Sequence, residues 1–295
     1  MLFFVYKEVF FYFVLQVNDV FIYLSGIEKT RMRMSKYFIL TSLLLLGFTN
    51  RMAAQFGFSH EIGGIFGPVA FQSDYGERHD FSTNAGNTGF GIGLIHYLNF
   101  SYRAECNCYT PETYFNDHFK LRSELSYNKT NLQHFGQWVD SKKNSLIANQ
   151  LRAMKGSTAV TNIGMQLEFY PLSIRDFTAT PGAWAPFFGL GAQFSFFKPT
   201  ASSDLGPGLG TLPTVTPVKY LDAFDTRGGT TWSIVSSVGT RYKLNEMSDL
   251  LLELRWQYYF SNWVDGLSPD PRIYTENKAN DWNLMLNFGY IYYLQ

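Results

Sequence analysis

The chain has 295 residues, with 24 Lys and Arg against 24 Asp and Glu, so its formal net charge at neutral pH is zero. Charged residues make up 16% and aromatic residues 18%, whereas soluble proteins average about 25% charged residues. The absence of a basic excess argues against a nucleic-acid-binding protein, and the aromatic content argues against a disordered chain. A mean hydropathy of -0.11 is too low for a polytopic helical membrane protein. The combination is typical of a membrane β-barrel, in whose strands apolar and polar residues alternate.

Two apolar stretches lie in the N-terminal part of the chain, and we interpret the second as a secretory signal. Residues 34–54 combine an early lysine, an apolar run over 37–48 and small residues before Gln55, which is the layout of a cleavable signal peptide. Three charged residues interrupt the first stretch, which disfavours a membrane helix there. We therefore predict that 1–33 is an upstream extension from a misassigned start codon. A true N-terminal membrane anchor is the alternative.

The mature chain, residues 55–295, repeats its hydrophobic pattern every second residue. From Trp282 to Leu294 the even positions are apolar and the odd positions are mostly small or polar, as expected of a strand with one apolar face. Soluble strands average about 5–6 residues, whereas these segments reach twelve or more, enough to cross a bilayer. The same alternation occurs in seven earlier segments: 56–67, 88–102, 118–129, 158–170, 186–197, 231–243 and 249–261.

The sequence therefore predicts an all-β fold, an eight-stranded antiparallel transmembrane β-barrel of the bacterial outer membrane. An even strand number brings both ends of the barrel to the periplasmic side. We accordingly expect the protein in the cell outer membrane, surrounded by outer-membrane lipid, with both barrel termini periplasmic.

Charged residues fall on the inward face of the predicted strands, towards their periplasmic ends. An eight-stranded barrel is only wide enough for side chains to fill, and buried charges must be paired. We interpret these residues as an ion-pair plug, with a polar conduit or a catalytic cluster as the alternative. The predicted plug consists of Glu61, Arg103, Lys120, Arg122, Glu124, Glu168, Arg241, Lys243, Glu253 and Arg255.

Two predicted periplasmic connections, 103–117 and 171–184, are long for such barrels, whose periplasmic turns are normally short. Long ordered connections often carry function, so we expect a docking surface for a periplasmic or lipoprotein partner. The alternative is that the connections only fold back as a lid on the barrel base. The docking candidates are Cys106, Cys108, Tyr109, Tyr114, Phe115, Arg175 and Phe177.

The sequence contains few signals of catalytic or cofactor chemistry. Gly-x-Ser-x-Gly, His-Glu-x-x-His and P-loop motifs do not occur, and the glycine repeats lack the dinucleotide spacing. We predict no catalytic, cofactor-binding or metal-binding residues and no nucleotide or nucleic-acid partner. For an enzyme at the outer rim, His79 and His134 are the loop candidates. For Cys106 and Cys108, three states are consistent with the sequence: a local disulfide, an intermolecular disulfide and two free thiols.

Acidic residues gather in the last predicted outer loop. Asp265, Asp270, Glu276 and Asp281 lie within seventeen positions of one another. They are the usual ligand type for Ca²⁺, but we interpret them as solvated loop acids.

The mature chain resembles a family of small outer-membrane barrels of flavobacteria and related Bacteroidota. Residues 60–67, 106–122, 258–265 and 281–285 carry this resemblance. The first of these also resembles the PorG-type barrel, which anchors the periplasmic ring of the type IX secretion and gliding machinery. These resemblances imply a non-enzymatic structural or anchoring barrel. The alternatives are an outer-membrane enzyme acting on lipid or peptide at the rim, and a small-solute channel.

Overall fold

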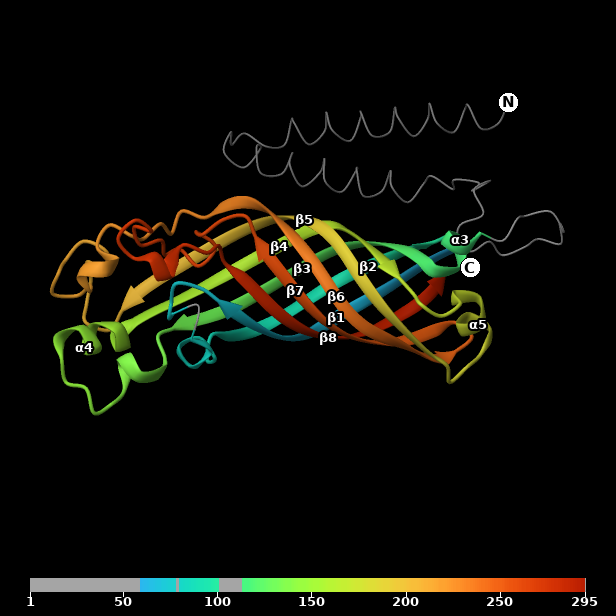
Figure 1. Ribbon diagram of the computed structural model, residues 1–295, viewed down its shortest axis with the longest axis horizontal. Coiled ribbons are helices and arrows are strands. Elements are labelled where there is room, and N and C mark those ends of the chain that lie inside the picture. Colours follow the sequence, from blue (N-terminus) through green and yellow to red (C-terminus); the bar gives the residue numbers. More distant parts are fainter. Residues whose placement is uncertain (1–58, 78–79, 101–112, 295) are drawn as a thin grey trace, which may run out of the picture. The chain divides into compact units, whose positions relative to one another are not determined.

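Each of the eight strands pairs antiparallel with its neighbours in the chain, and β8 pairs with β1 to close the barrel (Figure 1). In the computed structural model, residues 59–77, 80–100 and 113–294 are described. The predicted extension at 1–33 and signal peptide at 34–54 lie outside these residues. The strands are β1 (Ser59–Gln72), β2 (Thr88–Asn99), β3 (Phe119–Gln133), β4 (Met154–Phe169), β5 (Trp184–Ser203), β6 (Gly229–Asn245), β7 (Ser248–Tyr259) and β8 (Trp282–Leu294). The predicted eight-stranded antiparallel barrel is therefore confirmed.

Several strands are longer than the sequence pattern predicted. β5 has 20 residues and runs through Pro199, whereas the prediction ended at 197. Pairing of β5 with β6 ends at Phe197, and beyond this point β5 pairs with β4 alone. Pro199 can lie there because a proline is tolerated at a strand edge, where its missing N–H costs no ladder hydrogen bond.

The two ends of the barrel carry connections of different size. At the end that we call the base, β1 begins, β8 ends and the turn 246–247 joins β6 to β7. The base also carries α3 (Tyr114–His118) and α5 (Ile174–Ala179) (Figure 1). At the other end, the mouth, the loops are 73–87, 134–153, 204–228 and 260–281.

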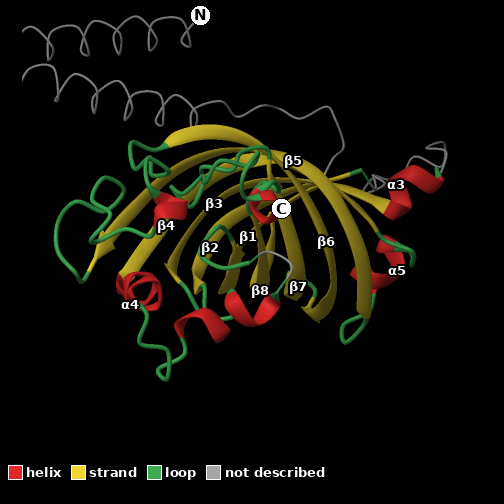
Figure 2. Ribbon diagram, turned by 60° about the vertical axis from the view of Figure 1, so that its left-hand side comes forward, coloured by secondary structure: helices red, strands yellow, loops and turns green. Residues whose placement is uncertain are grey.

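The mouth loops contain α4 (Leu146–Ala153) and four 3₁₀ turns. The turns are η1 (Phe81–Thr83), η2 (Gly136–Val139), η3 (Val218–Tyr220) and η4 (Thr275–Asn277). No helix among the described residues is long and apolar enough to cross a membrane. Figure 2 shows that helices and loops lie at the ends of the strands rather than between them.

The polarity of the barrel is the reverse of that of a soluble protein. Large apolar side chains cover the outside, where Leu190 is 65% and Leu94 63% exposed, while charged and amide side chains fill the inside. Aromatic pairs mark both ends of this apolar belt. Trp184 contacts Tyr242 towards the base, and Phe194 contacts Trp232 towards the mouth. An apolar band between aromatic girdles is the surface that a transmembrane barrel presents to lipid.

One close strand contact requires glycine. A Cβ atom on Gly67 of β1 would lie 1.8 Å from the carbonyl oxygen of Leu286 on β8. At Gly64, three residues earlier, the nearest atom would be 3.9 Å away. A side chain at position 67 would therefore force the backbones of β1 and β8 apart at this point of the seam that closes the barrel.

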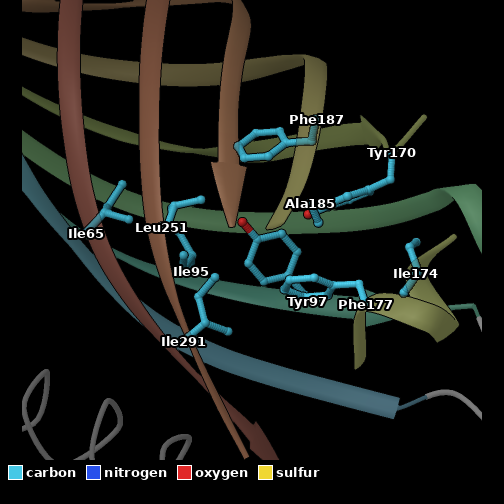
Figure 3. Packing of buried hydrophobic residues seen from close by; sticks show 10 residues of the cluster. All are labelled: Ile65, Ile95, Tyr97, Tyr170, Ile174, Phe177, Ala185, Phe187, Leu251 and Ile291. Atoms are coloured by element: carbon cyan, nitrogen blue, oxygen red, sulfur yellow. The ribbon is translucent and has the colours of Figure 1, made fainter. Parts of the chain in front are cut away.

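Two clusters of buried apolar side chains close the lumen. The base cluster includes Tyr97, Phe187 and Leu251 from the strands, together with Ile174 and Phe177 from α5 (Figure 3). The mouth cluster includes Phe71, Leu132 and Tyr259. Both ends of the lumen are thus packed.

Candidate functional site: the lumen and its base

A layer of ten charged side chains fills the half of the lumen nearer the base. We call it the charged layer, and each member is at most 6% exposed. Five acids face five cations, so the formal charge of the layer is zero. Its members are Glu61, Glu124, Glu168, Asp249, Glu253, Lys120, Arg122, Arg241, Lys243 and Arg255. Nine of these were expected on the inward face from the sequence, and Arg103, the tenth predicted residue, lies outside the described residues.

Glu61 joins two cations from opposite sides of the barrel. Its carboxylate accepts from Lys120 Nζ at 2.6 Å and from Arg241 at 2.5 Å. Arg241 also reaches Asp249 at 2.7 Å, and Lys243 reaches the same acid at 3.3 Å. Strands β1, β3, β6 and β7 are therefore connected across the lumen by one chain of ion pairs.

Arg122 is the second hub. Its guanidinium donates to Glu253 at 2.9 Å, to Glu124 at 2.8 Å and to Glu168 at 3.3 Å. Arg255 donates to both oxygens of Glu124, at 2.5 and 2.7 Å, and to Glu253 at 3.1 Å. Charge-assisted bonds of this kind satisfy several acceptors from one planar cation, so the carboxylates here are fixed from several sides.

Tyrosines complete the charged layer, and sequence reasoning missed them. Tyr97 and Tyr170 donate to Glu168 at 3.1 and 2.7 Å, and Tyr293 donates to Asp249 at 2.8 Å. Asp249 was missed as well, although it shares the odd-numbered inward face of Glu253 and Arg255. The signal that could have identified it was this alternation, which continues back to the first residues of β7.

Neutral side chains fill the half of the lumen nearer the mouth, and we call them the neutral layer. Gln257 is its centre, because its Nε2 donates to Asn162 at 3.0 Å and to Ser233 at 2.8 Å and also lies near Gln193 and Ser195. The neutral layer consists of Ser126, Asn128, Asn162, Gln193, Ser195, Ser233, Gln257 and Asn283.

The base does not present all the docking candidates to its surroundings. Phe177 is 4% exposed and packs in the base cluster, with the cations of Arg241 and Lys243 over its ring. Its prediction as a docking residue is therefore wrong. The α5 segment folds back into the lumen because Ile174 and Phe177 bury apolar area there. This arrangement matches the alternative expectation that the connection 171–184 forms a lid on the barrel base.

The other described docking candidates lie on or beside α3. Tyr114 is 64% and Phe115 45% exposed, and the backbone N–H of Arg175 donates to Asp117 at 3.1 Å, which joins α5 to α3. The helix begins at Thr113, whose side chain caps the N–H of Asn116. Cys106, Cys108 and Tyr109 lie outside the described residues.

Aromatic rings continue from α3 onto the strands. Phe115 contacts Phe100 with 5.1 Å between ring centroids and Phe119 with 4.8 Å, and Phe119 contacts Phe169 at 5.2 Å. Tyr114 stacks on His118 at 4.1 Å. The exposed rings of α3 therefore pack on rings behind them and form an aromatic surface.

The acids of the last mouth loop are not all solvated, which corrects the expectation from sequence. Asp265 and Asp281 are fully buried, and they accept backbone N–H groups of Leu267 and Val264, respectively. The carboxylate of Asp265 also accepts the N–H of Asp74 from the first mouth loop. These acids tie loops together, and within the described ranges no group of three metal-binding side chains is arranged around a metal site.

The remaining members of that loop pair at the surface. Asp270 binds Arg272 with 2.8 Å between charged groups, and Glu276 binds Lys219 at 2.8 Å.

His134, a candidate for chemistry at the outer rim, is half-buried in the mouth. Its ring lies between Tyr75 and Tyr220, at 5.3 and 5.5 Å between centroids. Burial, reinforced by the nearby charge of Lys219, lowers the pKa of His134 to about 3, so the ring is neutral at pH 7. Its Nε2 is buried without a hydrogen-bond partner in the described part of the chain. His79 lies outside the described residues.

Fold and surface together define an eight-stranded transmembrane β-barrel, the architecture of small bacterial outer-membrane proteins. No protein-family model and no curated protein matches the chain. Solved structures of similar architecture include OprG from Pseudomonas aeruginosa, with 14% identity over 80% of this chain and 96% of that one and a TM-score of 0.38.

Two further structures are similar at the same level. Ail of Yersinia pestis has 10% identity over 80% of this chain and 99% of its own, with a TM-score of 0.37. The outer membrane enzyme PagL has 8% identity over 79% and 98%, with a TM-score of 0.30. Similarity this weak carries no inference about the activity of this chain.

Proposed function

We propose that the chain is a non-enzymatic barrel of the bacterial outer membrane that anchors a periplasmic or lipoprotein partner at its base. The observation that carries the proposal is the filled lumen. Ten paired charges, a neutral layer and an apolar cluster at each end occupy it. A lumen packed in this way favours a structural role over a small-solute channel, because a solute would have to displace buried ion pairs.

The sizes of the connections support a periplasmic base. The four mouth loops have 15 to 25 residues, whereas the three base connections have 19, 14 and 2, so the mouth carries the longer loops on average. Transmembrane barrels have long external loops and short periplasmic turns. We therefore propose that both barrel termini, α3 and α5 face the periplasm.

The surface proposed for docking is the exposed aromatic face of α3, formed by Tyr114 and Phe115. Aromatic side chains are enriched in protein interfaces, and rings that are already held in place lose little conformational entropy on binding. The resemblance of residues 60–67 to the PorG-type barrel supports a component of the type IX secretion and gliding machinery as the partner.

Affinity capture from native membranes tests this proposal. We expect the wild-type barrel to retain a partner that a Tyr114→Ser/Phe115→Ser variant loses. The control is Leu146→Ser/Ile147→Ser, which removes two equally exposed apolar side chains from α4 at the mouth. The control is expected to retain the partner. Equal capture by both variants, or a partner lost only with the α4 substitutions, contradicts docking at the base.

A further inference from the structure

Charged residues are almost absent from the outer face of the described strands. Those present are all positively charged and all lie on neighbouring strands near the mouth. Along the outward positions of the eight described strands, the charged side chains are Lys129 on β3, Lys155 on β4 and Lys198 on β5. All three are exposed and lie in the halves of these strands nearer the mouth. The other five strands have no charged residue on this face.

Two of these lysines lie in one row across the sheet. Lys129 pairs with Ala159 of β4, and Ala159 pairs with Lys198 of β5. Their Cα atoms are therefore two strand spacings apart, about 10 Å. The small side chain of Ala159 leaves the space between the two lysine stems open.

Hydroxyl and amide groups flank this row of residues on its mouth side, and aromatic rings flank it on its base side. The next row towards the mouth is Asn131, Ser157 and Thr200, in which the two hydroxyl oxygens lie 2.8 Å apart. The next row towards the base contains Tyr127 and Phe196, which are 43% and 48% exposed and belong to the apolar belt.

Neither Lys129 nor Lys198 forms an ion pair within the described part of the chain. Lys155, two rows closer to the mouth, pairs with Asp204 at 2.6 Å, and both of these side chains are about half exposed. Two unpaired ammonium groups beside hydroxyl and amide donors form a surface that is complementary to a phosphate group.

We propose that this lysine strip, consisting of Lys129, Lys198, Asn131, Ser157 and Thr200, binds the phosphate-bearing headgroup of a lipid in the leaflet at the mouth. The strip continues directly into the lipid-facing belt, so one molecule can lay its acyl chains along Tyr127 and Phe196 and its phosphate between the two lysines. Lysines at a membrane surface attract anionic headgroups. This inference rests on the membrane orientation of the proposed function, but not on a partner at the base.

Lipid retention by the purified, folded barrel tests the proposal. The barrel is reconstituted in phosphatidylcholine nanodiscs containing a small fraction of diphosphorylated lipid A, and bound lipid is counted by native mass spectrometry after release into detergent. We expect enrichment of lipid A over its bulk fraction. Lys129→Gln/Lys198→Gln is expected to reduce retention about fivefold for each lysine removed.

The matched control removes the same charge elsewhere. Lys142→Gln/Lys143→Gln changes two exposed lysines in the β3–β4 loop, and its lipid retention is expected to equal that of the wild type. Lipid A without phosphates is expected not to be enriched, and millimolar inorganic phosphate is expected not to displace the bound lipid. Heat-dependent gel mobility verifies that each variant is folded.

Three results would overturn the strip as a lipid site. They are wild-type retention by Lys129→Gln/Lys198→Gln, complete displacement by inorganic phosphate, and a dimer of barrels held through the strip in place of lipid. Partner capture at α3 does not depend on these lysines, so a failed lipid site leaves the anchoring proposal standing. A barrel that cannot enter nanodiscs would instead contradict the membrane assignment.

Discussion

The two halves of the lumen are filled by different chemistry. In the charged layer, each acid is held by at least one cation on another strand, as Glu61 is held by Lys120 and Arg241. In the neutral layer, Gln257 shares donors and acceptors with several amides and hydroxyls. We therefore expect the loss of one group to cost more in the charged layer, where a charge is left without its partner, than in the neutral layer, where the remaining groups can still bond to one another.

The largest expected effect is in the charged layer. Glu61→Gln leaves Lys120 and Arg241 without their shared counter-charge, and breaking a buried ion pair on one side costs about 3–5 kcal/mol. Guanidinium unfolding of the barrel in lipid vesicles measures this loss. The control is Glu61→Gln/Lys120→Met, which restores equal numbers of acids and cations and is expected to be less destabilised than the sum of its single changes. Additive losses would refute the coupled network.

A smaller effect is expected in the neutral layer. Gln257→Met keeps a side chain of similar size and removes the amide that bridges β4, β5 and β6. The expected loss is about 1–3 kcal/mol, the cost of leaving buried polar partners unsatisfied, because Asn162 and Ser195 still bond to each other at 2.7 Å. The same vesicle unfolding assay applies. A loss as large as that of Glu61→Gln would remove the distinction between the two layers.

The mouth, above the neutral layer, should respond to acid through His134. Its folded-state pKa of about 3 lies below the ordinary value of 6.5, so the unfolded form binds the proton more tightly. The stabilisation is fully present above about pH 6.5 and is lost as the pH falls towards 3, by roughly 3 kcal/mol at pH 4. Hydrogen exchange of the mouth loops at pH 7 and pH 4, corrected for intrinsic rates, measures this loss.

The matched variant for this prediction is His134→Phe, which keeps a ring between Tyr75 and Tyr220 and cannot be protonated. It is expected to abolish the additional opening at pH 4. An unchanged acid response in His134→Phe would assign the effect to other groups.

Period-two alternation predicted the barrel and most of its charged layer because both depend on the direction in which successive side chains point. Glu61, Arg122 and Glu253 could be assigned to the lumen for this reason. The alternation could not identify which acid pairs with which cation, since partners such as Arg122 and Glu253 are 131 positions apart.

The connections could not be predicted because no repeating pattern governs them. Phe177 lies in a six-residue helix, too short for a 3.6-residue period, and the sequence gives no sign that it turns into the lumen. Asp265 and Asp281 could not be predicted to be buried, because the sequence does not show which backbone N–H groups their carboxylates accept. The extension of β5 through Pro199 depends on where its neighbour β6 ends, which is a property of the assembled sheet.

Single-channel recording in planar lipid bilayers tests the filled lumen most directly. Wild-type barrel, verified as folded by heat-dependent gel mobility and as inserted by protease protection, is expected to give no conductance steps at neutral pH. Reproducible steps from the wild-type barrel would show that ions cross the charged and neutral layers, and would contradict the structural role that the filled lumen supports.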